Sequence, residues 1–224
     1  RHLAGGCVAV ALSCSAGAVQ AVPQAFTAKG EGQTFQAGKP ERPMATTIHY
    51  AGGKLRIEMA GPVGAQGGPQ FNIILAQEGV RAVTLLNPAE KTAMKMDLRA
   101  AGAAGDQSLD FTAHFQVRDY ATTFRARSKV VGRETIAGEP CTVREQRGKD
   151  GHVKVWLSDR YEVPFRLTYL DRGKAAYTWT MKQFTPGMTL PASAFSVPAG
   201  FETVDLSEMM EGLNEAAKHP PRPR

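Results

Sequence analysis

Residues that could perform catalysis are few and widely separated in this chain. Apart from His2, the histidines are His49, His114, His152 and His219, and none lies within four residues of another. The sequence has no His-Glu-x-x-His or Cys-x-x-Cys motif, so it predicts no dedicated zinc site. It also has neither a Gly-x-Ser-x-Gly elbow nor a phosphate-binding loop ending in Gly-Lys-Ser/Thr. These patterns indicate a protein that is not an enzyme and binds no cofactor.

Cys141 is the remaining candidate nucleophile, because Cys7 and Cys14 lie in the first 21 residues. A thiol paired with a distant histidine could act as a catalytic nucleophile only in an activating environment. Cys141 follows Glu139-Pro140 at the start of an expected strand, where a small buried side chain is the more common role. A single cysteine forms no intramolecular disulfide, so the fold must rely on its core.

The first 21 residues have the features of a secretory signal peptide. Arg1 and His2 form a basic start, a run of small and apolar residues follows, and Val19-Gln20-Ala21 fits the small-x-small cleavage pattern. We therefore expect residues 1–21 to be removed, leaving a periplasmic protein. A membrane anchor would need about 20 firmly apolar residues.

Lipid anchoring at Cys7 or Cys14 is the competing interpretation of this segment. Bacterial lipoproteins are cleaved just before a cysteine, and a leucine is expected three positions earlier. Ala4 and Ala11 occupy those positions here. The sequence therefore favours a soluble exported protein over an anchored one.

The net charge of +6 comes mainly from the ends of the chain. Residues 22–217 carry 23 basic and 21 acidic side chains, and residues 218–224 form a basic, proline-rich tail that we expect to be disordered. No run of Lys and Arg marks a nucleic-acid surface. Transient contact of the tail with anionic lipid headgroups stays open.

Alternation of apolar and polar residues dominates the chain between these ends. Lys54-Leu55-Arg56-Ile57-Glu58-Met59 alternates without a break, as in a strand with one dry and one wet face. Strands are expected over residues 26–35, 44–50, 54–59, 71–75, 80–86, 94–98, 129–136, 141–146, 153–158, 165–169 and 177–182.

Turn residues separate these runs at intervals of about ten residues, which is typical of an antiparallel meander. The predicted fold is mainly β: residues 22–217 form one antiparallel sheet curled into an open half-barrel. Residues 60–69 are expected to be a loop. Helical elements are expected within residues 109–124, as a lid, and at residues 205–217, where Asp205 and Glu208 resemble a capping box.

The dry faces of these strands together form a large apolar surface. It could be a packed core, or it could line a cavity for an acyl chain, for which flexible methionines are well suited. The two expected helical segments are too small to cover it, which favours a cavity. The predicted lining residues are Leu55, Ile57, Met59, Phe71, Ile73, Leu75, Met94, Met96, Leu98, Val155, Leu157, Phe165, Leu167, Tyr169, Tyr177, Trp179 and Met181.

The order of these pieces resembles the periplasmic lipoprotein-carrier superfamily, which has the LolA/LolB/LppX-like fold, and more narrowly a related uncharacterised domain family. The resemblance covers most of residues 26–205. It rests on Gly53-Lys54-Leu55-Arg56-Ile57-Glu58, Asn87-Pro88-Ala89-Glu90-Lys91, Met94-Lys95-Met96, Gly138-Glu139-Pro140-Cys141, Val155-Trp156-Leu157-Ser158, Val163-Pro164, Leu190-Pro191 and, most specifically, residues 195–201.

This resemblance implies an open half-barrel with a helical lid over a lipid-binding cavity, and neither enzyme activity nor a metal. The expected function is a periplasmic carrier or binding protein for a lipid or acyl ligand, in lipoprotein or outer-membrane lipid trafficking. The alternative is a ligandless envelope module of the same fold that binds another envelope protein or senses stress.

Overall fold

The computed structural model describes residues 22–36, 38–63, 71–80, 82–97, 117–148, 151–188 and 190–206. The predicted signal peptide, the basic tail, Leu98 and most of the predicted C-terminal helix lie outside these residues. Within them, no helix is long and apolar enough to span a membrane.

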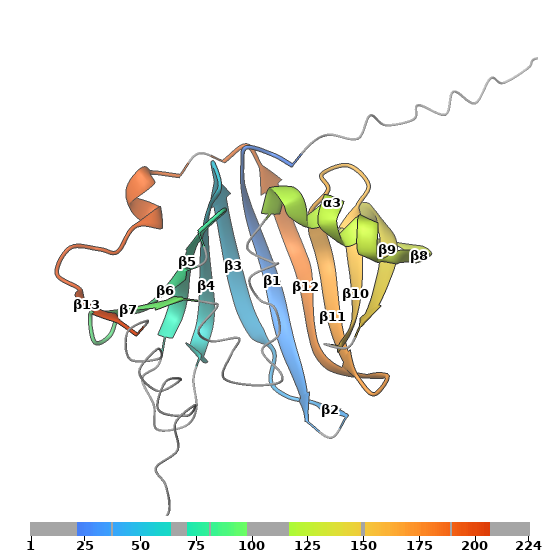
Figure 1. Cartoon of the computed structure of the whole chain (residues 1–224), viewed down its shortest axis with the longest axis horizontal. Helices are drawn as coiled ribbons and strands as arrows, with labels where there is room; N and C mark the ends of the chain where they lie inside the picture. The colour runs from blue at the N-terminus through green and yellow to red at the C-terminus, as the bar shows by residue number, and fades with distance from the viewer. Residues whose placement is uncertain are drawn as a thin grey trace, which may run out of the picture.

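One large sheet makes up most of the described structure (Figure 1). Its strands follow the order β13-β7-β6-β5-β4-β3-β1-β12-β11-β10-β9-β8, with β2 paired to β1. The strands are β1 (Ala25–Gln36), β2 (Lys39–Pro40), β3 (Met44–Ala51), β4 (Lys54–Val63), β5 (Phe71–Gln77), β6 (Ala82–Asn87), β7 (Thr92–Asp97), β8 (Lys129–Ile136), β9 (Glu139–Gly148), β10 (Gly151–Ser158), β11 (Pro164–Asp171), β12 (Lys174–Pro186) and β13 (Glu202–Asp205). The predicted open sheet and all eleven predicted strands are confirmed.

Tight turns connect neighbouring strands and set their register. The β3–β4 hairpin pairs Ala51 with Lys54 across Gly52 and Gly53, whose φ angles are 55° and 83°. Two successive positive φ angles define the type I′ turn, which matches the twist of an antiparallel hairpin and favours glycine. The predicted turn chemistry is therefore confirmed at this hairpin.

The sheet curls so that both flanks come forward from the central strands β3, β1 and β12 (Figure 1). Register shifts within β1, β10 and β11 mark bulges, which increase local twist and bend the strands. Helix α3 (Val117–Arg127) lies on the concave side, in front of β10 to β12. The 109–124 segment is thus helical from Val117 onward, and its earlier residues lie outside the described part.

Several details differ from the sequence-based expectation. Residues 60–63, predicted as part of a loop, continue β4. Residues 202–205 form β13, which pairs with β7 in parallel, so the sheet is not antiparallel throughout. Asp205, the predicted helix cap, is the last residue of that strand.

A further difference concerns β5, where Ile73 and Leu75 were predicted to share the inner face with Leu55 and Ile57. That prediction is wrong, because Ile57 pairs with Ile74 and Leu55 with Ala76, while Ile73 pairs with Glu58. Directly paired residues point to the same side of a sheet. Ile73 and Leu75 therefore face the convex side, and Ile74 takes the inner position.

The C-terminal segment explains why apolar side chains face outward there. Val197 and Phe201 pack on Ile73 and on a buried cluster of Leu75, Leu86 and Ala93. Next to this contact the Arg56 guanidinium donates a hydrogen bond of 3.0 Å to the Ala194 carbonyl of the 3-10 helix η1 (Ala192–Phe195). Residues 190–206 thus form a strap that covers the convex side of one flank.

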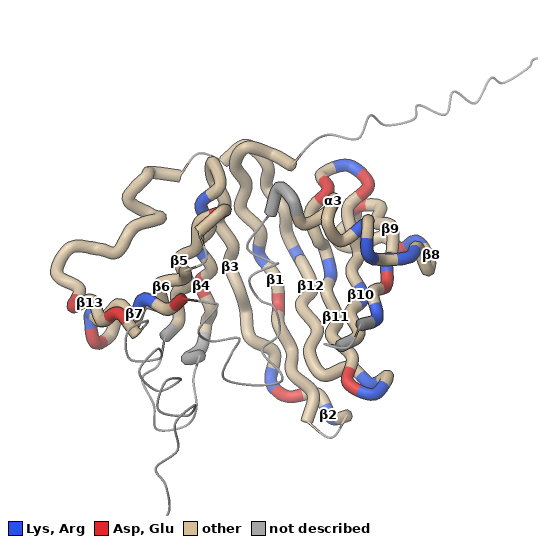
Figure 2. The backbone as a smooth tube through the Cα atoms, viewed as in Figure 1, with Lys and Arg blue, Asp and Glu red and all other residues tan. Residues whose placement is uncertain are grey.

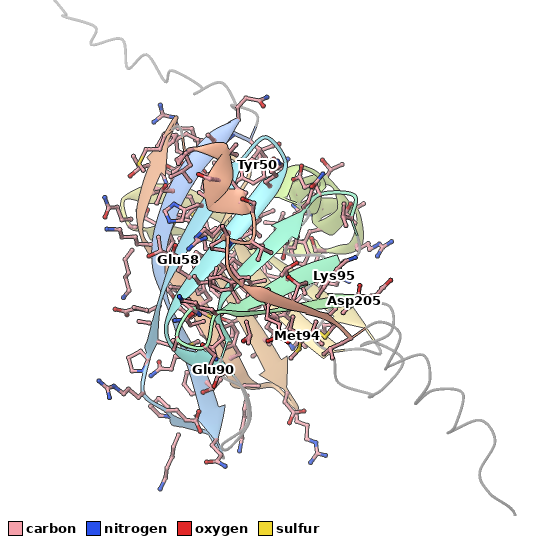
Figure 3. The ribbon with its side chains drawn as sticks, turned by 90° about the vertical axis from the view of Figure 1, so that its left-hand side faces the viewer. Tyr50, Glu58, Glu90, Met94, Lys95 and Asp205 are labelled. Carbon is pink, nitrogen blue, oxygen red and sulfur yellow. The ribbon has the colours of Figure 1, made fainter. Side chains whose placement is uncertain are left out.

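The end of the strap is tied to the sheet edge. The backbone amides of Glu202 and Leu206 donate hydrogen bonds of 2.9 Å to the carbonyls of Lys91 and Lys95. Lys95 and Asp205 also form an ion pair of 3.4 Å, and Figure 3 shows them together where β13 runs beside β7. The convex side of this flank is therefore a second small core, separate from the concave side.

Candidate functional site

The concave face of the sheet is dry at one end and half exposed at the other. On β4, Leu55 is buried and Ile57 and Met59 are half-buried; on β11, Phe165 is buried and Leu167 and Tyr169 are half-buried. Four successive antiparallel pairings connect β4 to β11, so the two strands run in the same direction. Both therefore become more exposed toward the same end of the sheet. We call the dry end the closed end and the half-exposed end the open end.

Aromatic rings fill the closed end. Phe26 stacks on Tyr50 with ring centroids 5.1 Å apart, and Phe184 contacts Phe26, Tyr161 and Phe165 at 4.9–5.4 Å. Tyr50 is 0% exposed and Phe165 is 2% exposed. These stacked and tilted rings pack together as a buried core.

The predicted lining residues differ in burial. Buried are Leu55, Val155, Leu157, Phe165, Trp179 and Met181, and α3 covers Val155 and Leu157 among them. Half-buried are Ile57, Met59, Met94, Met96, Leu167, Tyr169 and Tyr177. Met94 and Met96 face the concave side because they pair with Leu85 and Val83. Ile73 and Leu75 belong to the convex side, and the side chain of Phe71 lies outside the described set.

Helix α3 covers one part of this face. Tyr120, Ala121 and Phe124 form a buried cluster with Val155 and Leu157, against which Val153 and Leu167 pack. The register places Val155 opposite Leu167, so these side chains share the concave side of β10 and β11. The predicted role of this segment as a cover is thus seen for α3.

Polar contacts hold α3 in place. The Arg144 guanidinium donates hydrogen bonds of 3.0 Å and 2.9 Å to the carbonyls of Arg125 and Ser128 at the end of the helix. The last carbonyl groups of a helix have no hydrogen-bond partner within the helix, and these bonds satisfy two of them. A positive charge at this position also complements the helix dipole. Arg125 in turn forms an ion pair of 2.5 Å with Glu162 on the β10–β11 connection.

Two aromatic side chains of β12 lie close against glycines of β1. A Cβ atom at Gly30 would lie 2.6 Å from Cζ2 of Trp179, and one at Gly32 would lie 2.7 Å from the hydroxyl oxygen of Tyr177. Glycine is required at these two positions because any side chain would displace the rings. The rings form the floor of the concave face at the middle of the sheet.

The convex face of the other flank carries polar contacts around Trp156. Trp156, predicted to face the wetter side, donates a hydrogen bond of 2.6 Å from Nε1 to Glu134. The Arg166 guanidinium lies 5.1 Å from the Trp156 ring centre and pairs with Glu134 at 2.9 Å. That placement of Trp156 is confirmed.

Charged residues also surround the open end. The connections at the lower rim in Figure 2 carry both signs: Lys39, Glu41 and Arg42 near β2, and Asp171, Arg172 and Lys174 between β11 and β12. The half-exposed apolar side chains of the concave face are thus bordered by charges that remain in water.

The titratable side chains of the described part show no arrangement typical of catalysis. Burial raises the pKa of the Cys141 thiol to about 12, helped by the negative charge of Glu139, so the thiol stays protonated at neutral pH. Burial lowers the pKa of His49, whose Nδ1 lies 3.1 Å from the Thr27 hydroxyl oxygen. No three His, Cys, Asp or Glu residues of the described ranges could together hold a metal ion.

Sequence reasoning missed part of this face. Tyr50, Ile48 and Phe26 lie on it, and their alternation in the weaker strand patterns of β1 and β3 was the available signal. Ile74 was missed because the run Phe71-Asn72-Ile73-Ile74-Leu75 does not alternate. Tyr161 was missed because it lies in a connection between strands.

The profile of a family described as a domain of unknown function, DUF4412, matches residues 34–162. The chain belongs to the DUF4412 family. The match runs from the end of β1 through α3 and β10, so strands of both flanks lie within the DUF4412 segment, and β11, β12 and β13 lie beyond it. No curated protein matches the chain.

Solved structures match the fold of this DUF4412 protein at low sequence identity. An uncharacterised conserved protein from Thermus thermophilus is 12% identical, with a TM-score of 0.53 over 82% of this chain and 91% of that one. A putative outer membrane lipoprotein-sorting protein domain from Vibrio parahaemolyticus is 13% identical, with a TM-score of 0.41 over 77% and 89%. At this identity the likeness to the Thermus thermophilus protein is one of fold alone.

MucB is a further structure of this kind. In the complex of Pseudomonas aeruginosa MucA and MucB, the matched chain is 12% identical, with a TM-score of 0.44 over 80% of this chain. The present chain spans 58% of that one.

Proposed function

We propose that this protein is a periplasmic binding or carrier protein for a hydrophobic ligand, a lipid or an acyl chain, with a role in lipoprotein or outer-membrane lipid trafficking. The periplasmic location is supported by the signal-peptide features of residues 1–21. The ligand would lie on the open end of the concave face, between the flanks of the sheet.

One observation carries this proposal: the inner face stays apolar along its length while its burial falls from one end to the other. Ile57, Leu167 and Tyr177 keep part of their apolar surface in contact with solvent. Burying apolar surface stabilises by about 25 cal/mol per Å². An acyl chain laid along these side chains would remove that surface from water, and the charged rim would stay hydrated.

Native mass spectrometry of the protein purified from a periplasmic extract tests the proposal. We expect a lipid-sized adduct that is lost on delipidation and restored by adding a long-chain fatty acid or phospholipid. A protein that is free of adducts and binds no added lipid saturably would contradict the proposal.

A matched pair of variants locates the ligand. Leu167→Asp places a charge on the concave face of the open end, and we expect it to abolish lipid binding. Thr168→Asp places the same charge on the opposite face of the same strand, where the Thr168 hydroxyl lies 3.1 Å from the Thr178 hydroxyl. We expect Thr168→Asp to bind as the wild type does.

A second candidate function, a ligandless interaction module of the envelope, is supported by the edge strand β8. Val130 and Val131 are 56% and 45% exposed there, and β8 is the last strand of the described sheet on that side. An exposed strand edge offers hydrogen-bonding groups to an extended partner segment. If replacing Val130 and Val131 with Lys abolished capture of an envelope protein and lipid binding were absent, this candidate would be preferred.

A further inference from the structure

Two buried polar atoms of the described residues have no hydrogen-bond partner: Nε1 of Trp179 and Oδ1 of Asn72. A buried donor without a partner loses its hydrogen bonds to water and gains nothing in return, so such atoms are rare and call for an explanation. Trp179 is only 8% exposed. Its indole N–H therefore has little access to solvent.

The position of Trp179 places this N–H at the boundary between the closed and open ends. On β12 the next inward residue toward the closed end is Met181, 3% exposed, and the next toward the open end is the half-buried Tyr177. Trp179 pairs with Gly32 on β1 and Leu167 on β11, so its ring lies on the concave side. A Cβ at Gly30 would lie 2.7 Å from Cε2, the ring carbon that carries Nε1.

The close fit of the ring over Gly30 fixes the indole without satisfying its N–H. A phenylalanine would provide an apolar ring here with no unpaired donor, so packing alone does not account for a tryptophan. A hydrogen-bond acceptor supplied from outside the chain would account for it. That acceptor would have to reach the boundary between the closed and open ends, where Trp179 lies.

We propose that the Trp179 N–H donates a hydrogen bond to a carbonyl oxygen of the bound ligand, so that the ligand class is an acyl ester or carboxylic acid and not a pure hydrocarbon. This inference rests on the proposed lipid-binding function and deepens it. The carbonyl lies beside Trp179, and the alkyl chain extends along the half-buried side chains of the open end.

Asn72 marks a second polar point on the same face. It lies two residues from Ile74 on β5 and therefore points to the concave side, on the flank opposite β12. Its buried Oδ1 is free to accept a hydrogen bond from a ligand, and rotation of the amide would present the Nδ2 donor instead.

Paired ligands and paired variants test the role of Trp179. Methyl laurate and tetradecane have main chains of equal length and differ in the ester group, and each would be measured by competition with a fluorescent fatty acid. We expect Trp179→Phe to weaken the binding of methyl laurate about tenfold, equivalent to ~1.4 kcal/mol. The affinity for tetradecane should stay within twofold of the wild-type value. The control Trp156→Phe, on the convex face, should change neither.

The outcomes separate this inference from the function on which it rests. If Trp179→Phe weakened the binding of both ligands equally, or of neither, the proposed hydrogen bond would be refuted and lipid binding would stand. If the wild type bound neither ligand, the proposed function would fail, and this inference with it.

A measurement on the wild type does not depend on how the variant folds. In a ¹⁵N-labelled protein, the indole N–H proton of Trp179, assigned by its absence in Trp179→Phe or its presence in Trp156→Phe, should move downfield with methyl laurate and stay in place with tetradecane. Equal shifts with both ligands would overturn the inference.

Discussion

The closed and open ends of the concave face are built by the same strands from the same alternating pattern, yet they differ in what covers them. On β11, Phe165 packs among aromatic rings, whereas Leu167, two residues further along, stays half-buried. The closed end therefore has the close packing of a core. The open end has core-like residue types without a complete cover from the described residues. The difference teaches that alternation determines which way a side chain points, and that tertiary neighbours determine whether it is buried.

The largest expected effect comes from removing one side chain at each end of β11. Phe165→Ala should lower the free energy of unfolding by about 3–5 kcal/mol, because it leaves a cavity in the aromatic cluster. Leu167→Ala should cost only about 1–2 kcal/mol, because part of that side chain is already in water and fewer packing contacts are lost. Urea denaturation of both variants measures the difference. Equal losses would mean that the two ends are packed alike.

A smaller effect is expected at the floor between the two ends. Gly30→Ala brings a methyl group against the Trp179 ring and 2.8 Å from the Thr180 carbonyl oxygen. Overpacking of this kind costs about 1–3 kcal/mol, and the displaced indole should weaken lipid binding.

Gly132→Ala is the matched control for this change. Gly132 also lies in a strand, on the exposed edge β8, and a Cβ there meets nothing within 4 Å. The free energy of unfolding of Gly132→Ala should stay within about 0.5 kcal/mol of the wild-type value. A Gly30 variant as stable as the Gly132 variant would show that the Trp179 ring is free to move.

Much of this comparison was accessible from the sequence, because the strands on the concave side alternate. Lys54 to Met59 predicted both the strand and its inner residues correctly. The β5 run Ile73-Ile74-Leu75 is apolar on both sides, so its inner residue depends on Val197 and Phe201, far along the chain, which cover the convex side. The closed end was not recognised as a separate region, because Tyr161 lies in a connection and packs with Phe184 through tertiary contact alone.

The convex face of β9 and β10 uses polar contacts where the closed end of the concave face uses aromatic packing. Glu145 on β9 accepts hydrogen bonds from Arg147, at 3.1 Å, and from His152. Burial alone would raise the pKa of the Glu145 carboxyl, but these hydrogen bonds outweigh it and hold the pKa below its ordinary value of 4.5.

This depressed pKa predicts a pH dependence that is confined to one region. The contribution of Glu145 to stability is fully present above pH 4.5, its unfolded-state value, and is lost as the pH falls through the lower folded-state pKa. Glu145→Gln should therefore destabilise the protein at pH 7 and much less at pH 3. Amide exchange in β9 and β10 near His152 should rise in acid before exchange at the closed end does. A stability difference that does not change with pH would contradict this assignment.

The smallest expected effect concerns the thiol of the closed half. Cys141 is buried and its pKa of about 12 keeps it protonated. Labelling of the native protein with a maleimide at pH 7.5 should be about a hundred times slower than in denaturant. Rapid native labelling would show that the closed end opens readily.

The central claim is that the open end binds a lipid and the closed end does not. Methyl-resolved NMR of the protein titrated with a long-chain fatty acid tests it most directly. We expect saturable shifts at Met59 and Leu167, and none at Val163, which is buried in the closed end. No saturable shift, or shifts confined to β8 or the 190–206 strap, would contradict the account.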